Sequence, residues 1–146
     1  MIGGVALQLQ GSSYTTFDLD LAYERTRQNT MRLAAALETF KPRPREFPPD
    51  LPFIFDAQAL LSNELLTLET TAGDVDLLAS VKGIGGFDAV ATFAESVAYD
   101  GFTLQVLSID GLIIAKRAAG RPKDQAGLLE LEALREARNL ARDNEL

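Results

Sequence analysis

Alternation of apolar and polar residues predicts a strand over residues 16–23, early in the chain. The apolar positions are every second residue, namely Phe17, Leu19, Leu21 and Tyr23. Successive side chains of a strand point to opposite faces, so Asp18 and Asp20 are expected to lie on the other face. The pattern therefore predicts a strand with one apolar face and one acidic face.

Helical spacing and turn residues predict the other elements. A helix is expected over 26–40, with Thr26 as its N-cap and an apolar stripe that consists of Met31, Ala34, Ala35 and Leu37. Further helices are expected over 5–10, 57–61, 87–94, 108–119 and 124–143. Further strands are expected over 53–55, 65–70, 75–79, 97–99 and 102–107, and Asp100-Gly101 is the turn between the last two.

Strands and helices alternate along the whole chain, without an internal repeat or a linker. Residues 41–52 hold five of the six prolines and are predicted to be a loop, as are residues 83–86. We expect one α+β (α/β) domain over residues 1–146, with a mixed twisted sheet flanked by helices. In the last helix, the apolar stripe is expected to pack into the core; it comprises Leu128, Leu131 and Leu134.

Composition narrows the chemistry that this domain can perform. The chain has no cysteine and no histidine, which excludes disulfides, thiol nucleophiles and imidazole bases. The start has no basic signal region and no apolar stretch reaches the length of a membrane span, so a cytoplasmic protein with no membrane contact is expected. The net charge of −7 means that the overall electrostatic field of the protein does not attract nucleic acid. A local basic patch is still possible, because basic residues gather at 41–45 and 116–123.

A glycine pair followed by paired aspartates is the strongest candidate for chemistry. Thirteen residues separate Gly3-Gly4 from Asp18-Leu19-Asp20. Glycine lacks Cβ, so the backbone can approach a phosphate closely, and the helix that follows could offer its first amides to the same group. Two carboxylates on one side of a strand can share a hard cation such as Mg²⁺ or Mn²⁺. Two acids on a solvated strand face are also common without any metal.

This spacing resembles the signature of the DNA polymerase β-like nucleotidyltransferase superfamily. There, a hydrophobic residue and Gly-Gly or Gly-Ser precede a helical span and an Asp-hydrophobic-Asp motif. The string from Ile2 to Asp20 looks like that of small bacterial nucleotidyltransferase-like proteins, some relatives of which are toxins of toxin–antitoxin pairs. The resemblance is tight over residues 2–21 and loose elsewhere.

The resemblance implies a function as well as a fold. It implies metal-dependent transfer of a nucleotidyl group from a nucleoside triphosphate such as ATP to an RNA, protein or small-molecule hydroxyl. The cofactor would be Mg²⁺ or Mn²⁺, held by Asp18 and Asp20. For a toxin, an antitoxin would be the partner.

The superfamily uses a third carboxylate from a later strand, and Asp76 matches its hydrophobic-Asp-hydrophobic pattern. Asp74 would face the same way and is the reserve. In the alternative interpretation, Asp74 belongs to the turn at Gly73 and Asp76 is merely solvated.

A basic segment at the end of the helix over 108–119 resembles a second element of the toxin-type proteins. Lys116 could balance the charge of a triphosphate, Arg121 or Lys123 could hold phosphate, and Asp124 could orient one of these cations. The same residues also suit the ends of two helices on dipole grounds alone.

The chain departs from the superfamily at its start, because only Met1 and Ile2 precede Gly3. The N-terminal strand is therefore expected to be truncated, and a homo-oligomer or a preceding segment to cover the neighbouring strand edge. Two other functions stay open. One is a catalytically inactive nucleotidyltransferase-fold protein that acts as a binding or regulatory module. The other is a structural domain in which the aspartates do not converge.

Overall fold

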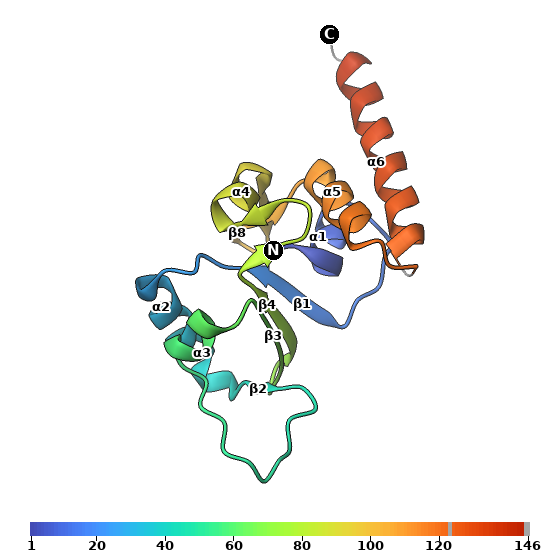
Figure 1. Ribbon diagram of the computed structural model, residues 1–146. Helices are drawn as coiled ribbons and strands as arrows, with labels where there is room; N and C mark the ends of the chain where they lie inside the picture. Colours follow the sequence, from blue (N-terminus) through green and yellow to red (C-terminus); the bar gives the residue numbers. More distant parts are fainter. Residues whose placement is uncertain (123, 145–146) are drawn as a thin grey trace.

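Four strands form the central sheet of the computed structural model, which describes residues 1–122 and 124–144 (Figure 1). Their order across the sheet is β1-β4-β3-β2. Strand β1 (Asp18–Ala22) is parallel to β4 (Gly73–Leu78), whereas β3 (Leu65–Thr70) is antiparallel to both β4 and β2 (Arg43–Pro44). The prediction of one α+β domain with a mixed sheet is confirmed.

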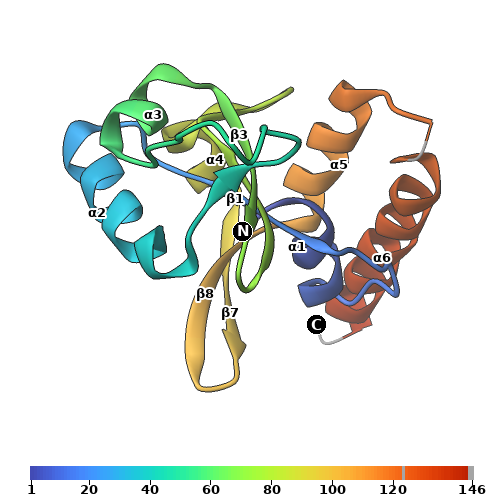
Figure 2. The ribbon, with the colours of Figure 1, turned by 90° about the horizontal axis from the view of Figure 1, so that it is seen from below.

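One face of this sheet is apolar and packs against helices α2 (Arg27–Leu37) and α3 (Ala57–Ser62), which lie on the same side of the sheet in Figures 1 and 2. The buried residues of this core are Tyr23, Leu60, Leu66, Leu68, Leu77 and Ala79. Leu66 and Leu68 are alternate residues of β3, as the two-residue period of a strand requires. Each large side chain buried in this way contributes roughly 1.5–3 kcal/mol to stability.

The opposite face of the sheet changes character along β1 and β4. Aspartates come first on both strands, whereas Ala22 and Leu78 come last and pack into a second core. The two strands are parallel and in register, so the acidic residues collect at one end of this face and the apolar residues at the other.

The second core lies between the sheet, helices α1 (Gly3–Leu9) and α5 (Ile109–Ala119), and the hairpin of β7 (Ala94–Tyr99) and β8 (Phe102–Leu107). Its most deeply buried members are Ala6, Leu7, Val106, Leu107, Leu112, Ile113 and Leu131. This core covers the face of the sheet opposite to α2 and α3, at the end where Ala22 and Leu78 lie.

Residues 1 and 2 connect the sheet to the hairpin. The backbone amide of Ile2 donates to the carbonyl of Asp20 (3.0 Å), and the amide of Leu107 donates to the carbonyl of Met1 (2.9 Å). The Ile2 side chain is buried in the second core. This pairing places Gly3 beside the middle of β1.

Smaller elements complete the chain. A short hairpin of β5 (Ser80–Val81) and β6 (Gly85–Gly86) leads into α4 (Phe87–Thr92), and a 3-10 turn η1 (Glu38–Phe40) follows α2. Residues 85–86 were predicted to be loop, but they pair with β5. A two-residue strand has no periodicity of its own, so the sequence pattern could not indicate it.

Helix α6 (Asp124–Asn144) is the longest described, and its far end projects away from the rest of the molecule (Figure 1). Leu131 is fully buried, and Leu128 and Leu134 pack beside it, so the prediction that this stripe belongs to the core is confirmed. Among the helices described, none combines the length and the apolar character needed to cross a membrane.

The predicted helix ends are well matched by the structure. The Thr26 hydroxyl accepts from the Asn29 amide (3.3 Å), and the Ser108 hydroxyl accepts from the Gly111 amide (3.3 Å). Gly120 ends α5 with φ of +64°, a conformation that costs glycine little. Gly120 fixes where α5 stops, and therefore where the basic segment after it begins.

Two predictions about the segment from 41 to 55 are wrong. Residues 53–55 form no strand; Phe53 instead packs against Phe47, with ring centroids 5.7 Å apart. The predicted loop contains β2, in which Arg43 and Pro44 pair with β3. Proline lacks an amide hydrogen, but β2 is the outer strand of the sheet, where a missing donor is tolerated.

Three positions of the predicted apolar faces are exposed. Phe17 lies before β1 and is 92% exposed, Met31 is 57% exposed, and Ala35 is exposed as well. The buried side of α2 consists instead of Thr30, Leu33, Ala34 and Leu37. Thr30 can be buried because its hydroxyl donates to the Arg27 carbonyl (3.1 Å), so its polar group is satisfied inside the helix.

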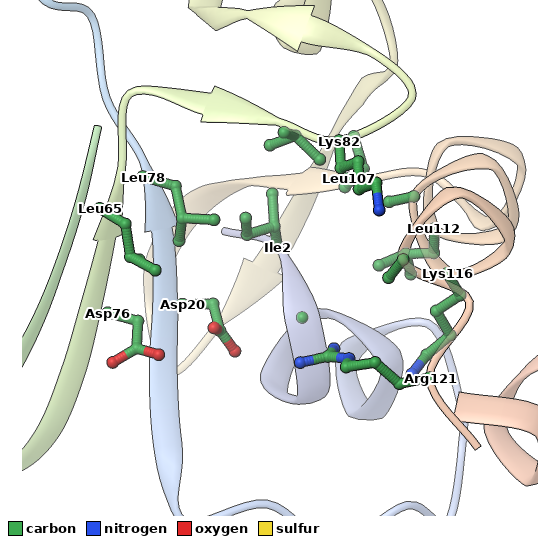
Figure 3. Close-up of a pocket in the computed structure, with 14 residues that line it drawn as sticks. Ile2, Asp20, Leu65, Asp76, Leu78, Lys82, Leu107, Leu112, Lys116 and Arg121 are labelled. Carbon is green, nitrogen blue, oxygen red and sulfur yellow. The ribbon is translucent and has the colours of Figure 1, made fainter. Parts of the chain in front are cut away.

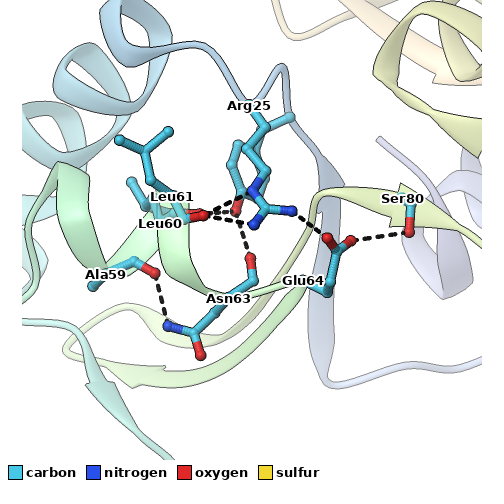
Figure 4. A network of polar contacts seen from close by, with 8 residues as sticks. Arg25, Ala59, Leu60, Leu61, Asn63, Glu64 and Ser80 are labelled. Atoms are coloured by element: carbon cyan, nitrogen blue, oxygen red, sulfur yellow. Dashed lines mark hydrogen bonds and ion pairs between the residues drawn. The ribbon is translucent and has the colours of Figure 1, made fainter.

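A polar network ties the end of β1 to α3 (Figure 4). Arg25 donates to the Leu61 carbonyl through Nε (2.9 Å) and Nη2 (2.6 Å), and it also pairs with Glu64. The Asn63 side chain donates to the Ala59 carbonyl (2.8 Å) and closes the helix end. These contacts satisfy the last carbonyls of α3 and anchor the chain just beyond the acidic strand.

Candidate active site

Three carboxylates converge at the acidic end of the sheet. Asp18 and Asp20 come from β1, and Asp76 comes from β4, where it lies in register with Asp20. One carboxylate oxygen of each residue lies within 4.8 Å of the other two. Figure 3 shows Asp20 and Asp76 side by side at one end of a pocket. The alternative in which the aspartates do not converge is therefore excluded.

The cluster carries unfavourable electrostatics in the absence of a cation. Burial raises the pKa of Asp20 to about 6, and the charges of Asp18 and Asp76 add to this effect, whereas the Gly4 amide and Arg121 oppose it. Burial also raises the pKa of Asp76, although Arg45 acts in the opposite direction. A donor set of three close carboxylate oxygens suits a hard divalent cation, which would relieve this repulsion.

The two glycines are required by the carboxylate strand itself. A Cβ at Gly3 would lie 2.0 Å from Oδ2 of Asp20, and a Cβ at Gly4 would lie 2.5 Å from Cβ of Thr16. Gly3 also has φ of +65°, which L-residues adopt at a cost. The sequence interpretation assigned the glycines to phosphate approach; the structure adds that their small size lets α1 pack directly against β1.

Thr16 fixes the first aspartate and was not identified from the sequence. Its hydroxyl donates to Oδ1 of Asp18 at 2.6 Å. Thr16 also packs against Gly4, so its hydroxyl is held in place. The hydroxyl therefore orients the Asp18 carboxylate toward those of Asp20 and Asp76. The contact spans two residues just ahead of β1, where no sequence pattern marked Thr16 as a ligand-positioning residue.

Arg45 is a second residue that the sequence analysis missed. Its guanidinium pairs with Asp76 and lies 3.5 Å from Oδ2 of Asp74. The Arg45 amide donates to the Thr67 carbonyl (2.9 Å), so the pairing of β2 with β3 brings this side chain onto the acidic face. The sequence analysis noted the basic residues at 41–45. It could not place Arg45 next to β4, because the prolines of this segment predicted a loop where β2 forms.

Across the pocket, an ion-pair cluster holds two of the predicted cations, the largely buried Lys116 and Arg121, whose side chain is 58% exposed. Asp124 accepts from Lys116 Nζ (3.0 Å) and from Arg121 Nε (2.7 Å). The side chains of Lys116 and Asp124 are 12% and 6% exposed. Burial by itself raises the pKa of Asp124, but the hydrogen bonds and charges of Arg121 and Lys116 outweigh it and hold the pKa below its ordinary value.

Tyr14 and Gly127 shape the surroundings of Lys116. Its ammonium lies 5.3 Å from the centre of the Tyr14 ring, a favourable cation–π distance. A Cβ at Gly127 would lie 3.2 Å from Cε of Lys116, so glycine at this point of α6 leaves room for the lysine stem. The lysine is thus held from three sides, and its position is well defined.

The pocket itself has a volume of about 380 Å³, within the range of small-molecule sites. Figure 3 shows its layout: Asp20 and Asp76 on one side, Lys116 and Arg121 on the other, and aliphatic side chains beyond them. Gly3 lines the pocket next to Asp20. A ligand with both cation-bound and free anionic groups would fit between these opposite charges.

The structure brings together most of the predicted site residues. Asp74 lies apart from the three converging carboxylates; its side chain is 44% exposed and faces Arg45. Asp124 orients two cations, as expected for the reserve residue. Lys123 lies outside the residues that the structure describes.

Neither a protein-family model nor a curated protein sequence matches this chain. The geometry of the site is therefore the basis for its functional interpretation.

Proposed function

We propose that the chain is a metal-dependent nucleotidyltransferase, which transfers a nucleotidyl group from a nucleoside triphosphate to a hydroxyl acceptor. One observation carries the proposal: Asp18, Asp20 and Asp76 converge on one side of a pocket whose other side presents Lys116 and Arg121. The motif resemblance to the DNA polymerase β-like superfamily, described above, supports the same reaction.

The charges of the pocket complement a metal-bound triphosphate. Three carboxylates suit Mg²⁺ or Mn²⁺. The basic side chains opposite them, Lys116 and Arg121, suit phosphate oxygens whose negative charge the metal does not neutralise. Asp124 supports this division because it holds both cations by ion pairs and keeps them oriented. Pairing also lowers the cost of burying the Lys116 ammonium before any ligand arrives.

Asp18 and Asp20 are proposed to hold the metal, and Asp76 to share it and accept a proton. The metal, when bound, supplies electrostatic stabilisation of the charge that develops on the triphosphate. Burial and neighbouring carboxylates raise the pKa of Asp76 in the metal-free protein, although Arg45 opposes them. Arg45 pairs with the same carboxylate and would compete with the metal for its negative charge.

The reaction would proceed by displacement at the α-phosphorus. The acceptor hydroxyl oxygen forms a bond to the α-phosphorus, and the bond from that phosphorus to the α,β-bridging oxygen breaks. The hydroxyl proton passes to Asp76, and pyrophosphate leaves with the bridging oxygen. Lys116 and Arg121 would stabilise the negative charge of the departing pyrophosphate.

The test is transfer of label from α-³²P nucleoside triphosphates, with Mg²⁺ or Mn²⁺, to total RNA, to protein and to small hydroxyl compounds. We expect labelled product and pyrophosphate with the wild-type chain, and loss of both in Asp20→Asn. Asp50→Asn is the matched control, because Asp50 is exposed in the loop over 41–52 and lies outside the carboxylate cluster. Equal labelling by wild type and Asp20→Asn would contradict the proposal.

A further inference from the structure

We infer that Lys82 recognises a carbonyl oxygen of the nucleobase, so that the site prefers keto-bearing bases to adenine. This inference rests on the proposed function, because it concerns the base of the triphosphate that the charged half of the pocket would hold. Lys82 belongs to neither the carboxylate cluster nor the Asp124 cluster, and the proposed reaction does not use it.

The pocket continues beyond its charged half into an aliphatic half. Leu78, Val81, Leu107, Leu112 and Ala115 line this part. In Figure 3, Lys82 lies at the end of the pocket away from Asp20 and Asp76. A nucleoside triphosphate has the same polarity: its phosphates are charged and its base is a flat, largely apolar ring with polar edges. The triphosphate in the charged half therefore directs the base toward Lys82.

The backbone that carries Lys82 is held firmly in place. Lys82 lies at the tip of the β5–β6 hairpin, where the Ile84 amide donates to the Val81 carbonyl (3.0 Å). The next residue, Gly83, has φ of +85°, and a Cβ there would lie 2.6 Å from Cβ of Ala118 and 3.2 Å from the Ile114 carbonyl oxygen. The hairpin tip thus packs directly on α5, the helix that also carries Lys116.

The ammonium of Lys82 is available to a ligand. In the described part of the chain, no carboxylate lies within 4.0 Å of it, whereas Lys116 and Arg121 are both paired with Asp124. The aliphatic side chains around it offer no acceptor. A lysine at the polar edge of an apolar slot is expected to donate to an acceptor on whatever ring occupies that slot.

Lysine chemistry determines which base edge fits. An ammonium has three donors and no acceptor, so it matches a carbonyl oxygen and opposes an exocyclic amino group. Hypoxanthine and adenine form the sharpest matched pair, because they differ at position 6 by a carbonyl oxygen against an amino group. A hydrogen bond from a charged group typically gives a preference of about tenfold.

The experiment is calorimetric titration, with Mg²⁺, of the α,β-methylene analogues of ITP and ATP and of inorganic tripolyphosphate. We expect the wild-type chain to bind the ITP analogue about tenfold more tightly than the ATP analogue. Lys82→Met keeps the length of the stem and removes the ammonium; it should weaken the ITP analogue to the level of the ATP analogue and leave tripolyphosphate unchanged. Arg142→Met, at the far end of α6, controls for the loss of one positive charge.

The outcomes separate this inference from the proposed function. Equal binding of the two analogues by the wild-type chain would overturn base recognition and leave triphosphate binding intact. A parallel loss of tripolyphosphate affinity in Lys82→Met would also overturn it, because Lys82 would then be a phosphate ligand. Absence of binding by all three ligands would overturn the proposed function and this inference with it.

Discussion

Gly3 and Asp20 pack so closely that a Cβ on Gly3 would lie 2.0 Å from Oδ2 of Asp20. The residues are joined by more than proximity, since the Ile2 amide that precedes Gly3 donates to the Asp20 carbonyl (3.0 Å). The glycine turn and the carboxylate strand are therefore one structural unit. A change on either side should move the metal-binding oxygens.

Gly3→Ala should damage the carboxylate site more than the fold. The left-handed φ costs an L-residue about 1–2 kcal/mol, and the new methyl group must displace the Asp20 carboxylate. We expect Mn²⁺ affinity, measured by electron paramagnetic resonance, to fall about tenfold or more. Gly73→Ala is the control: it imposes a positive φ of +123° but has no neighbour within 4 Å, so it should lose stability and keep its Mn²⁺ affinity.

Asp20→Asn should stabilise the metal-free protein at high pH. The folded protein raises the pKa of Asp20 from 3.8 to about 6, mainly through burial, so its folded state binds the proton more tightly than the unfolded state. The stability associated with that proton is fully present below pH 4 and is lost as the pH rises through 6. Asparagine cannot ionise and avoids this loss.

The difference should be visible in urea unfolding without metal. We expect Asp20→Asn to exceed the wild type by about 1–2 kcal/mol at pH 8, a discounted conversion of the pKa shift, and by much less at pH 4. Asp50→Asn should change stability little at either pH. An Asp20→Asn variant that is less stable than the wild type at pH 8 would show that the folded protein does not disfavour the ionised form of Asp20.

Asp124→Asn should be among the more destabilising single changes in the site. It leaves the buried Lys116 ammonium without its carboxylate partner, which typically costs about 3 kcal/mol. Glu132→Gln is the control, because its partner Arg117 is 56% exposed and such pairs contribute less than about 1 kcal/mol. Thermal or urea unfolding of both variants measures the difference; equal effects would mean that the Asp124 cluster does not hold its cations firmly.

Arg45→Gln should raise the affinity of the carboxylates for a divalent cation. The guanidinium pairs with Asp76 and competes with a metal for the negative charge of that carboxylate. We expect the Arg45→Gln variant to bind Mn²⁺ at pH 8 with at least about threefold higher affinity than the wild type. Arg43→Gln is the control, because Arg43 lies two residues earlier and donates to the carbonyls of Pro48 and Leu51 instead. Weaker Mn²⁺ binding in Arg45→Gln would mean that Arg45 positions Asp76 for the metal rather than competing with it.

Local signals in the sequence were sufficient for much of the fold. The turn at Asp100-Gly101 has positive φ at both residues, and the Ser108 cap and Gly120 stop bound α5 as expected. The convergence of Asp76 with Asp18 and Asp20 was expected only from the resemblance to the nucleotidyltransferase superfamily, because the pattern alone did not show that β1 and β4 pair in register.

The residues that the sequence did not indicate depend on contacts between distant segments. Arg45 reaches Asp76 across 31 residues through a two-residue strand within a proline-rich stretch, and such a strand has no readable period. Lys82 enters the pocket because Gly83 lets a hairpin tip pack on α5. Met31 was misplaced because a buried Thr30 satisfies its own hydroxyl within α2, which shifts the inner face by one residue.

The most direct test of the central claim is Mn²⁺ binding, measured by electron paramagnetic resonance with and without an α,β-methylene nucleoside triphosphate analogue. We expect the wild-type chain to bind Mn²⁺ at the Asp18, Asp20 and Asp76 cluster, with tighter binding when the analogue is present. The Asp18→Asn/Asp20→Asn double variant should bind at least about tenfold more weakly, while Asp50→Asn should match the wild type. Equal Mn²⁺ affinity in the double variant and the wild type would contradict the account.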